Sequence, residues 1–254
     1  MSGWKARRFW NRAEAAPCPG GFTVLLDGRP VKTPGKAPLV LPSLDLARAC
    51  AAEWDAQTGA VQPASMPLTR YANSAIDKVA AQHADVVQIV AAYGETDLLC
   101  YRAETPQALR ERQAAGWDGH LRWAAEVLGA PLRVTAGVVP VPQDPASIAA
   151  LRARVSAMDA FHLAALHDLV AITGSLILGL AMADRRIEAD EAFGLSRIDE
   201  QWQAELWGQD EDAAEKEARK RDDLATALRF LRLCGQDSCP VDAGKGTKLP
   251  GDPR

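Results

Sequence analysis

Residues 169–183 read LVAITGSLILGLAMA and contain no charged side chain. A membrane-spanning helix needs about 20 apolar residues, and this stretch of 15 is closed by Asp168 on one side and Asp184 on the other. The composition therefore predicts a helix buried on most of its faces inside a helical domain, running over about 160–183. Small residues recur at every fourth position and would form a ridge for close helix packing; they are Ala171, Ser175, Gly179 and Ala183.

Helical patterns extend outward from this stretch in both directions. Apolar spacing, helix-capping residues and terminating glycines or prolines predict helices over about 67–79, 85–93, 106–128, 144–158, 196–207 and 211–233. Ser196 is the expected N-cap of the helix over 196–207. After Leu233 the apolar periodicity stops and glycine and proline become frequent, so residues 234–254 are predicted to be a disordered tail.

The first eighty residues have a different character. Short apolar runs over 22–26 and 29–33 flank Asp27-Gly28, a dipeptide typical of tight hairpin turns, and 38–41 could add a third strand. Ser43 is a suitable N-cap for a helix over about 43–57. The expected fold class is thus α+β, with a small β-containing N-terminal domain (1–80) followed by a larger, mostly α-helical domain (81–233).

Composition excludes several classes of protein. The 254 residues carry 29 basic and 33 acidic side chains, a net charge of -4, which gives no overall attraction to nucleic acid or anionic lipid. The five cysteines are an odd, scattered set and indicate a reducing compartment rather than a disulfide framework. These are Cys18, Cys50, Cys100, Cys234 and Cys239.

Motifs for cofactors, metals and catalysis are weak. The only lysine-containing glycine cluster, residues 244–247, lacks the order of a phosphate-binding loop, and no dinucleotide fingerprint follows a strand. His162 and His167 are five residues apart and diverge on a helix, so we expect no metal site and no cofactor. An enzyme is not required by anything in the sequence. The alternative that stays open is a hydrolase using His162 or His167 with Asp168.

The tryptophans and the acidic residues give a clearer indication of function, because both are common at protein interfaces. The chain has seven tryptophans, most beside charged or amide residues, which is common for anchors at protein interfaces. Residues 197–217 contain eight acidic side chains against Arg197 and Lys216. This acidic strip could bind a basic surface of a partner, although core packing would equally account for its tryptophans.

Several phrases, in order and spacing, resemble one known family. They are RFW (8–10), LDGRPVKTP (26–34), EWDAQ (53–57), MPLT (66–69) and TDLLCYR (96–102), continued by Gln113, Trp117-Asp118, Gly174-Ser175, Asp199-Glu200 and Trp207-Gly208. Together they are similar to the ATP synthase assembly chaperones that act on the alpha subunit of the catalytic head. The resemblance covers about residues 7–233 and excludes the tail.

The resemblance implies a non-catalytic binding protein with a small β-containing domain and a larger helical domain. Its partner would be the free alpha subunit, kept from aggregating until it meets the beta subunit, with no nucleic acid, membrane segment or small-molecule substrate. The matched positions imply partner binding by Asp199, Glu200, Trp202 and Trp207, and a structural or interface role for Trp54 and Asp55.

The start of the family phrases also predicts where in the cell the protein acts. Because the family phrases begin at residue 8, with no room before them for a transit sequence, a bacterial cytoplasmic protein is expected, or one of the mitochondrial matrix if the source is eukaryotic. A scaffold or adaptor with another partner is the alternative to the chaperone and the hydrolase.

Overall fold

The computed structural model describes residues 7–208 and 211–235. The predicted tail from residue 236 on, with Cys239 and the glycine cluster 244–247, lies outside the described residues. Cys234, which we had assigned to that tail, is instead buried directly after the last helix. Its thiol donates to the carbonyl of Phe230 at 3.2 Å, so the ordered chain continues past Leu233.

The N-terminal sheet has three antiparallel strands: β1 (Ala13–Cys18), β2 (Gly21–Leu26) and β3 (Arg29–Pro30). Asp27 and Gly28 have φ values of 47° and 78°, which confirms the predicted hairpin turn between β2 and β3. Strand β1 was not predicted, and β3 is shorter than the predicted strand over 29–33. The segment 38–41 makes only isolated bridges, in which Leu41 pairs with Phe22 and Pro38 with Lys32.

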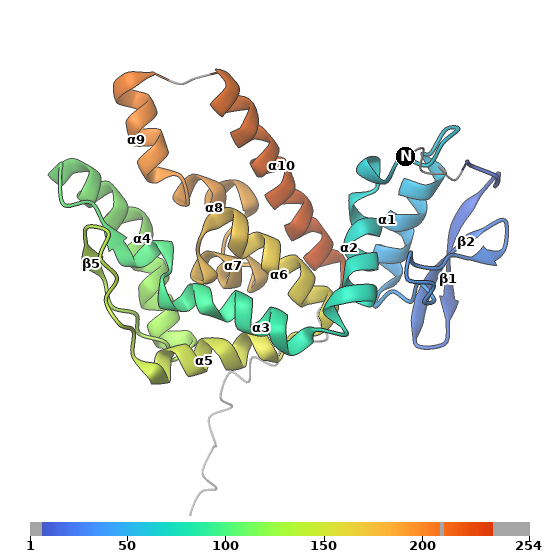
Figure 1. The fold of residues 1–254 in the computed structure, drawn as a ribbon, viewed down its shortest axis with the longest axis horizontal. Helices are drawn as coiled ribbons and strands as arrows, with labels where there is room; N and C mark the ends of the chain where they lie inside the picture. The colour runs from blue at the N-terminus through green and yellow to red at the C-terminus, as the bar shows by residue number, and fades with distance from the viewer. Residues whose placement is uncertain (1–6, 209–210, 236–254) are drawn as a thin grey trace, which may run out of the picture.

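Helix α1 (Leu44–Asp55) packs across this sheet (Figure 1). The hydroxyl oxygen of Ser43 accepts a hydrogen bond from Leu46 N at 3.0 Å, so the predicted N-cap is confirmed. The helix buries Leu46, Ala47, Cys50 and Ala51 toward the sheet core. Its length and its position are thus set by one capping hydroxyl and one apolar face.

Helix α2 (Pro67–Ser74) connects the sheet region to the rest of the molecule, because it contacts α1 as well as α6 and α10. The short 3-10 turn η1 (Pro63–Ser65) precedes it and the π-helical turn η2 (Ala75–Val79) continues it. Both carboxylate oxygens of Glu53 cap its first turn and accept the backbone N–H groups of Leu68 and Thr69, each at 2.8 Å. The predicted domain boundary at residue 80 stays a prediction.

The remaining elements form a helical body with one small strand pair. Its helices are α3 (His83–Ala92), α4 (Gln107–Val127), α5 (Pro145–Ser156), α6 (Ala160–Thr173), α7 (Leu176–Ala183), α8 (Ala189–Leu195), α9 (Ile198–Trp207) and α10 (Glu211–Leu233). Two 3-10 turns, η3 (Tyr93–Glu95) and η4 (Leu98–Cys100), lead into β4 (Tyr101–Arg102), which pairs in parallel with β5 (Thr135–Ala136). The small sheet followed by a mostly helical body confirms the α+β class.

The apolar stretch at residues 169–183 is buried as expected, but the single helix over 160–183 is wrong. Gly174 (φ 70°) ends α6 in a left-handed conformation, and Ser175 starts α7 by accepting a hydrogen bond from Leu178 N at 3.0 Å. The predicted small-residue ridge is therefore wrong as well, since Ala171 is exposed and Ser175 is a cap. None of the described helices combines the length and the apolar character that crossing a membrane requires.

One buried carboxylate fixes the break between α6 and α7. Asp97 is fully buried and accepts hydrogen bonds from the Ser175 hydroxyl at 2.7 Å and from Ile177 N at 3.0 Å. Gly179 lets the two helices approach, because a Cβ there would lie 2.6 Å from Cγ2 of Val170. The α6–α7 corner is thus specified by a polar contact and by a close approach of the two helices.

Candidate functional site: a groove between two helices

Helices α9 and α10 lie side by side at one end of the helical body (Figure 1). Side chains of both helices line a groove of about 780 Å³. Its lining from the α9 side is Arg197, Glu200, Gln201, Gln203, Ala204, Glu205, Trp207 and Gly208, and from α10 it is Ala213, Lys216, Glu217 and Lys220. A second cavity of about 640 Å³ shares Arg197, Glu200, Gln203 and Lys220, is also lined by Asp199, and reaches Trp117 and the 173–174 corner. We call the two together the α9–α10 groove.

The start of α9 differs from the prediction. The Ser196 hydroxyl donates back to the carbonyl of Phe193 at 2.9 Å, so it closes α8 and does not cap α9. Arg197 occupies the N-cap position, and its side chain makes no capping hydrogen bond. Acidic residues in the first turn, Asp199 and Glu200, complement the positive end of the helix dipole instead.

Asp199 and Glu200 point in different directions, as neighbouring residues on a helix must. Asp199 accepts a hydrogen bond from Nε2 of Gln113 at 2.6 Å and thereby ties α9 to α4. Glu200 faces the groove, where its carboxylate lies 3.2 Å from Nη1 of Arg197 and its side chain is 52% exposed. Glu200 therefore has the more accessible carboxylate for a partner.

Arg197 is held in place by more than Glu200. Its Nη2 donates to the carbonyl of Ile172 at 2.9 Å, its guanidinium lies 5.4 Å from the ring centre of Phe193, and its side chain is only 14% exposed. Since the Ile172 carbonyl belongs to the C-terminal end of α6, this arginine joins that helix end to the first turn of α9. The base of the groove wall that carries Glu200 is therefore tied to the end of α6.

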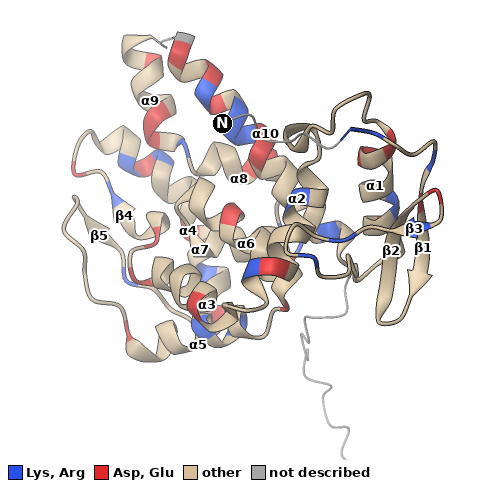
Figure 2. Ribbon diagram, turned by 45° about the vertical axis from the view of Figure 1, so that its right-hand side comes forward, with Lys and Arg blue, Asp and Glu red and all other residues tan. Residues whose placement is uncertain are grey.

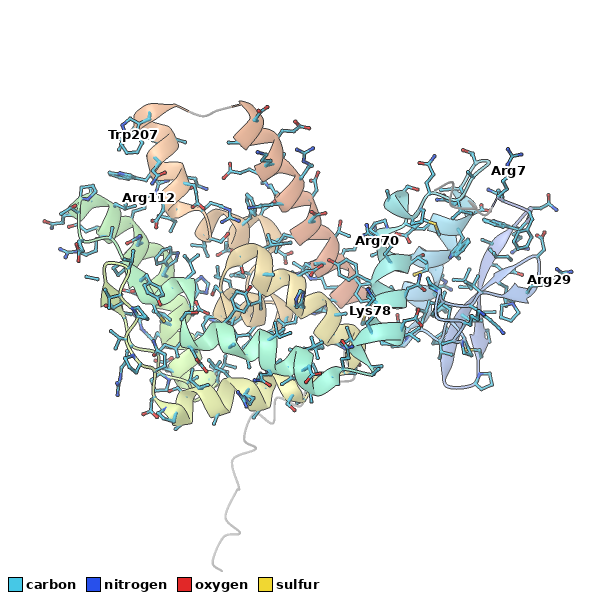
Figure 3. The ribbon with its side chains drawn as sticks, viewed as in Figure 1. Arg7, Arg29, Arg70, Lys78, Arg112 and Trp207 are labelled. Atoms are coloured by element: carbon cyan, nitrogen blue, oxygen red, sulfur yellow. The ribbon has the colours of Figure 1, made fainter. Side chains whose placement is uncertain are left out.

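The two predicted tryptophans have different environments. Trp202 is half-buried and packs against the core, and it is not part of the groove lining. Trp207 is 78% exposed and lies beside Leu206, which is 58% exposed, at the end of α9 (Figure 3). Below them Arg112 of α4 holds both carboxylate oxygens of Glu205 at 2.8 Å. The exposed end of α9 thus presents apolar surface above a fixed ion pair.

The acidic strip of residues 197–217 is not one surface. Glu205 is paired with Arg112, Glu215 with Arg219 at 3.1 Å, and Asp199 with Gln113. Asp210 and the side chain of Glu211 lie outside the described residues. The groove between the helices is of mixed charge, with both signs present along α10 (Figure 2).

Sequence reasoning missed the lysines on the α10 side. Lys216 and Lys220 are four residues apart and therefore share one face of the helix, and that face lines the groove. The spacing was visible in the sequence. What the sequence did not show is that α10 would turn this face toward α9.

Trp54 and Asp55 lie at the end of α1, far from α9 in the fold (Figure 1). The ring of Trp54 packs edge-on against Trp10 with centroids 5.3 Å apart, and its buried indole N–H has no hydrogen-bond partner among residues 7–208 and 211–235. Asp55 pairs with Arg8 at 3.1 Å, and the same guanidinium donates to the carbonyl of Gln57 at 2.8 Å. Both residues serve here to close the sheet against α1.

The histidines of the hydrolase alternative do not converge. His162 hydrogen-bonds the Asp159 carboxylate at 3.0 Å and the carbonyl of Gly235 at 3.1 Å. His167 lies 2.8 Å from Asp168, which also accepts a 2.5 Å hydrogen bond from the Tyr71 hydroxyl. Burial would raise the pKa of Asp168, but the hydrogen bonds from His167 and Tyr71 outweigh it and lower that pKa.

No serine, threonine or cysteine in the described part of the chain is hydrogen-bonded to either of these histidines, so a nucleophile is not placed beside them. In the same described ranges, no group of three or more His, Cys, Asp or Glu side chains is arranged to hold a metal ion.

Comparison with known proteins identifies the family. Over 92% of its length the chain superposes on the whole of the crystal structure of Atp12 from Paracoccus denitrificans, with a TM-score of 0.89 and 53% sequence identity. The chain belongs to the ATP12 chaperone family. A family profile described as "ATP12 chaperone protein" matches residues 7–125.

Two further relatives agree with this membership. The structure of a candidate chaperone from Agrobacterium tumefaciens is 42% identical, has a TM-score of 0.85, and covers 90% of this chain and 86% of its own. Mitochondrial protein atp12 of Schizosaccharomyces pombe is 26% identical over 243 residues, which are 91% of this chain and 84% of that protein. The resemblance found in the sequence is thereby confirmed, and the protein is a chaperone of ATP synthase assembly.

Proposed function

We propose that this ATP12 family protein binds the free alpha subunit of ATP synthase, prevents its aggregation and hands it to the beta subunit. The observation that carries the proposal is the α9–α10 groove, which combines an accessible carboxylate, Glu200, with the exposed apolar end of α9. We further propose that the protein works by binding alone, without a catalytic step, a cofactor or a small-molecule substrate.

A chaperone for an unassembled subunit needs this kind of surface. Subunits of a permanent complex expose large apolar interfaces before assembly, and such surfaces associate unspecifically in water. Trp207 and Leu206 offer apolar contact area at the rim of the groove, and tryptophan is among the residues that contribute most to binding energy at interfaces. Glu200 adds a charged contact that favours one orientation of the client.

The four predicted partner-binding residues divide into two roles in this proposal. Glu200 and Trp207 contact the alpha subunit directly. Asp199 and Trp202 position α9, the first through its hydrogen bond to Gln113 and the second through packing on the core. Trp54 and Asp55 support the sheet region at the opposite end of the fold.

The test is the refolding of isolated alpha subunit, followed by light scattering in the absence of nucleotide. We expect a molar excess of the protein to suppress scattering, and a Trp207→Ser variant with an unchanged melting temperature to suppress it less. If the parent protein at a molar excess leaves scattering unaltered, the proposed partner is wrong.

The place of action follows from the same proposal, since the alpha subunit is synthesised or imported where ATP synthase is assembled. We propose the cytoplasm for a bacterial source and the mitochondrial matrix for a eukaryotic one. Fractionation of the native cell, with detection of the protein and the alpha subunit in the same fraction, tests this.

A further inference from the structure

Lys216 and Lys220 are the feature of the groove that the proposed function does not use. Both line the larger cavity, and Lys220 lines the second cavity as well, together with Glu200. Within the described residues, neither ammonium group has a carboxylate partner within 4.0 Å. Each lysine is therefore available to a group that enters the groove.

The two walls of the groove have opposite charge. On the α9 wall Glu200 pairs with Arg197 and Glu205 pairs with Arg112, but the carboxylates are the more exposed partners: Glu200 is 52% and Glu205 57% exposed, against 14% for Arg197 and 35% for Arg112. The charge that this wall presents to the groove is therefore mainly negative. The α10 wall carries Lys216 and Lys220 against the single carboxylate of Glu217. A chain segment that lies between the walls meets a surplus of negative charge on one side and of positive charge on the other.

We infer that the groove is built for a client segment with basic side chains facing α9 and acidic side chains facing α10. This inference rests on the proposed function, and it makes Lys216 and Lys220 determinants of which part of the alpha subunit is bound. A purely basic segment, as the acidic strip alone would suggest, places its cations against two lysines, and like charges brought together at an interface oppose binding.

Lys220 lies on the opposite wall of the groove from Glu200. It lines the same cavity as Glu200, so an ion pair of the client with Glu200 and one with Lys220 fall within one continuous space. In a partly desolvated groove both pairs gain strength relative to bulk water, because the screening by solvent is weaker there. Binding and orientation of the segment then depend on both walls.

The experiment measures the affinity of isolated alpha subunit for the parent and for the double variant Lys216→Glu, Lys220→Glu by titration at moderate salt. We expect the double variant to bind at least about tenfold more weakly, with an unchanged melting temperature. A client segment that is only basic predicts the opposite sign, since the variant adds carboxylates to the groove.

A matched control is available on the same helix. Arg229 is exposed, lies outside the groove lining, and Arg229→Glu reverses its charge in the same way. We expect this control to bind within about twofold of the parent. Equal or tighter binding by the double variant overturns the inference and leaves the proposed function standing, whereas a parent protein that does not bind the alpha subunit overturns both. If the double variant does not fold, single Lys216→Gln and Lys220→Gln variants replace it, and each must weaken binding.

Discussion

The N-terminal sheet region and the helical body use acidic residues in different ways. Residues 7–80 contain nine basic and six acidic side chains, a net charge of +3, and residues 81–235 contain sixteen and twenty-four, a net charge of -8. In the first region several carboxylates accept backbone N–H groups, while Glu14, Asp45 and Asp55 pair with arginines. Asp27 accepts from Asn11 and Arg12, and Glu53 caps α2.

In the helical body many carboxylates pair with arginine across helices instead. Examples are Arg154–Asp184 at 2.5 Å, Arg232–Glu188 at 2.7 Å and Arg221–Asp190 at 2.7 Å. Since acidic residues are in excess there, some remain accessible, and Glu200 is one that lines a groove. Under the proposed function, the sheet region serves stability and the end of the helical body serves binding.

The largest change in folding stability is expected at Trp54, in the sheet region. Replacing Trp54 by Ala removes its packing against Trp10 and the core. Loss of a fully buried tryptophan costs about 3 to 5 kcal/mol, so the partly buried Trp54 is expected to cost up to about 3 kcal/mol. We expect a strongly lowered melting temperature, and alpha-subunit binding that persists below it. Thermal unfolding followed by circular dichroism measures the first effect.

Trp207→Ala is the control for that measurement, because Trp207 is exposed and its removal should change stability by less than about 0.5 kcal/mol. A Trp54→Ala protein that melts like the parent but no longer binds the alpha subunit would assign Trp54 to the interface and reverse the roles of the two regions.

The second prediction concerns Asp97, a fully buried acidic residue of the helical body that accepts backbone N–H groups as Asp27 and Glu53 do in the sheet region. Burial raises the pKa of Asp97 to about 6, although hydrogen bonds from Ile177 N, Leu99 N and Ser175 partly oppose this. A carboxyl whose folded-state pKa lies above its unfolded value of 3.8 binds more protons in the folded state, so its contribution to stability falls as pH rises from about 4 to about 6. The full change is about 3 kcal/mol.

Asp97→Asn cannot titrate, which isolates this contribution. We expect the free energy of unfolding of the parent, relative to the variant, to decrease between pH 4 and pH 6 and to stay level above pH 7. Urea unfolding at four pH values measures it. A difference between the two proteins that is constant with pH contradicts the prediction.

Local signals predicted much of this fold. The Asp27-Gly28 turn, the Ser43 cap and the burial of 169–183 each depend on neighbouring residues, and all three are confirmed. The break at Gly174 was missed because its cause is remote. Asp97 lies more than seventy residues away in sequence and supplies the acceptor that lets α7 begin at Ser175.

The candidate site was only partly predictable, because the contacts that orient its side chains join residues far apart in the sequence. The family phrases predicted Glu200 and Trp207, which both line the groove, and their binding role stays a prediction. Asp199 was predicted beside Glu200 without its contact to α4. The distance from Asp199 to Gln113 is not visible in the sequence, and it is this contact that directs Asp199 toward α4 and leaves its carboxylate less exposed than that of Glu200. Strand β1 was missed because AEAAPC lacks the β-branched and aromatic residues that favour strands.

The third prediction is that Glu200→Gln weakens binding of the alpha subunit and leaves folding stability nearly unchanged. Glu200→Gln keeps the shape of the side chain and removes its charge, and its ion pair with Arg197 is exposed enough to contribute less than about 1 kcal/mol to folding. We expect a nearly unchanged melting temperature and alpha-subunit affinity reduced at least about tenfold, equivalent to about 1.4 kcal/mol. Titration at moderate salt measures it, and affinity within twofold of the parent removes Glu200 from the interface.

The smallest effect is expected at Asp199, the neighbour of Glu200. Its variant tests whether binding depends on the total charge of α9 or on the direction in which one carboxylate points. Asp199→Asn makes the same change of charge on the same turn of α9, but its side chain keeps an oxygen that can accept from Gln113. The variant loses only the additional strength that a charged acceptor gives the hydrogen bond, about 0.5 to 1 kcal/mol of folding stability. We therefore expect a small decrease in the urea midpoint and an affinity within about threefold of the parent. If Asp199→Asn weakens binding as much as Glu200→Gln does, the client responds to the total charge of α9, and the specific contact proposed for Glu200 is wrong.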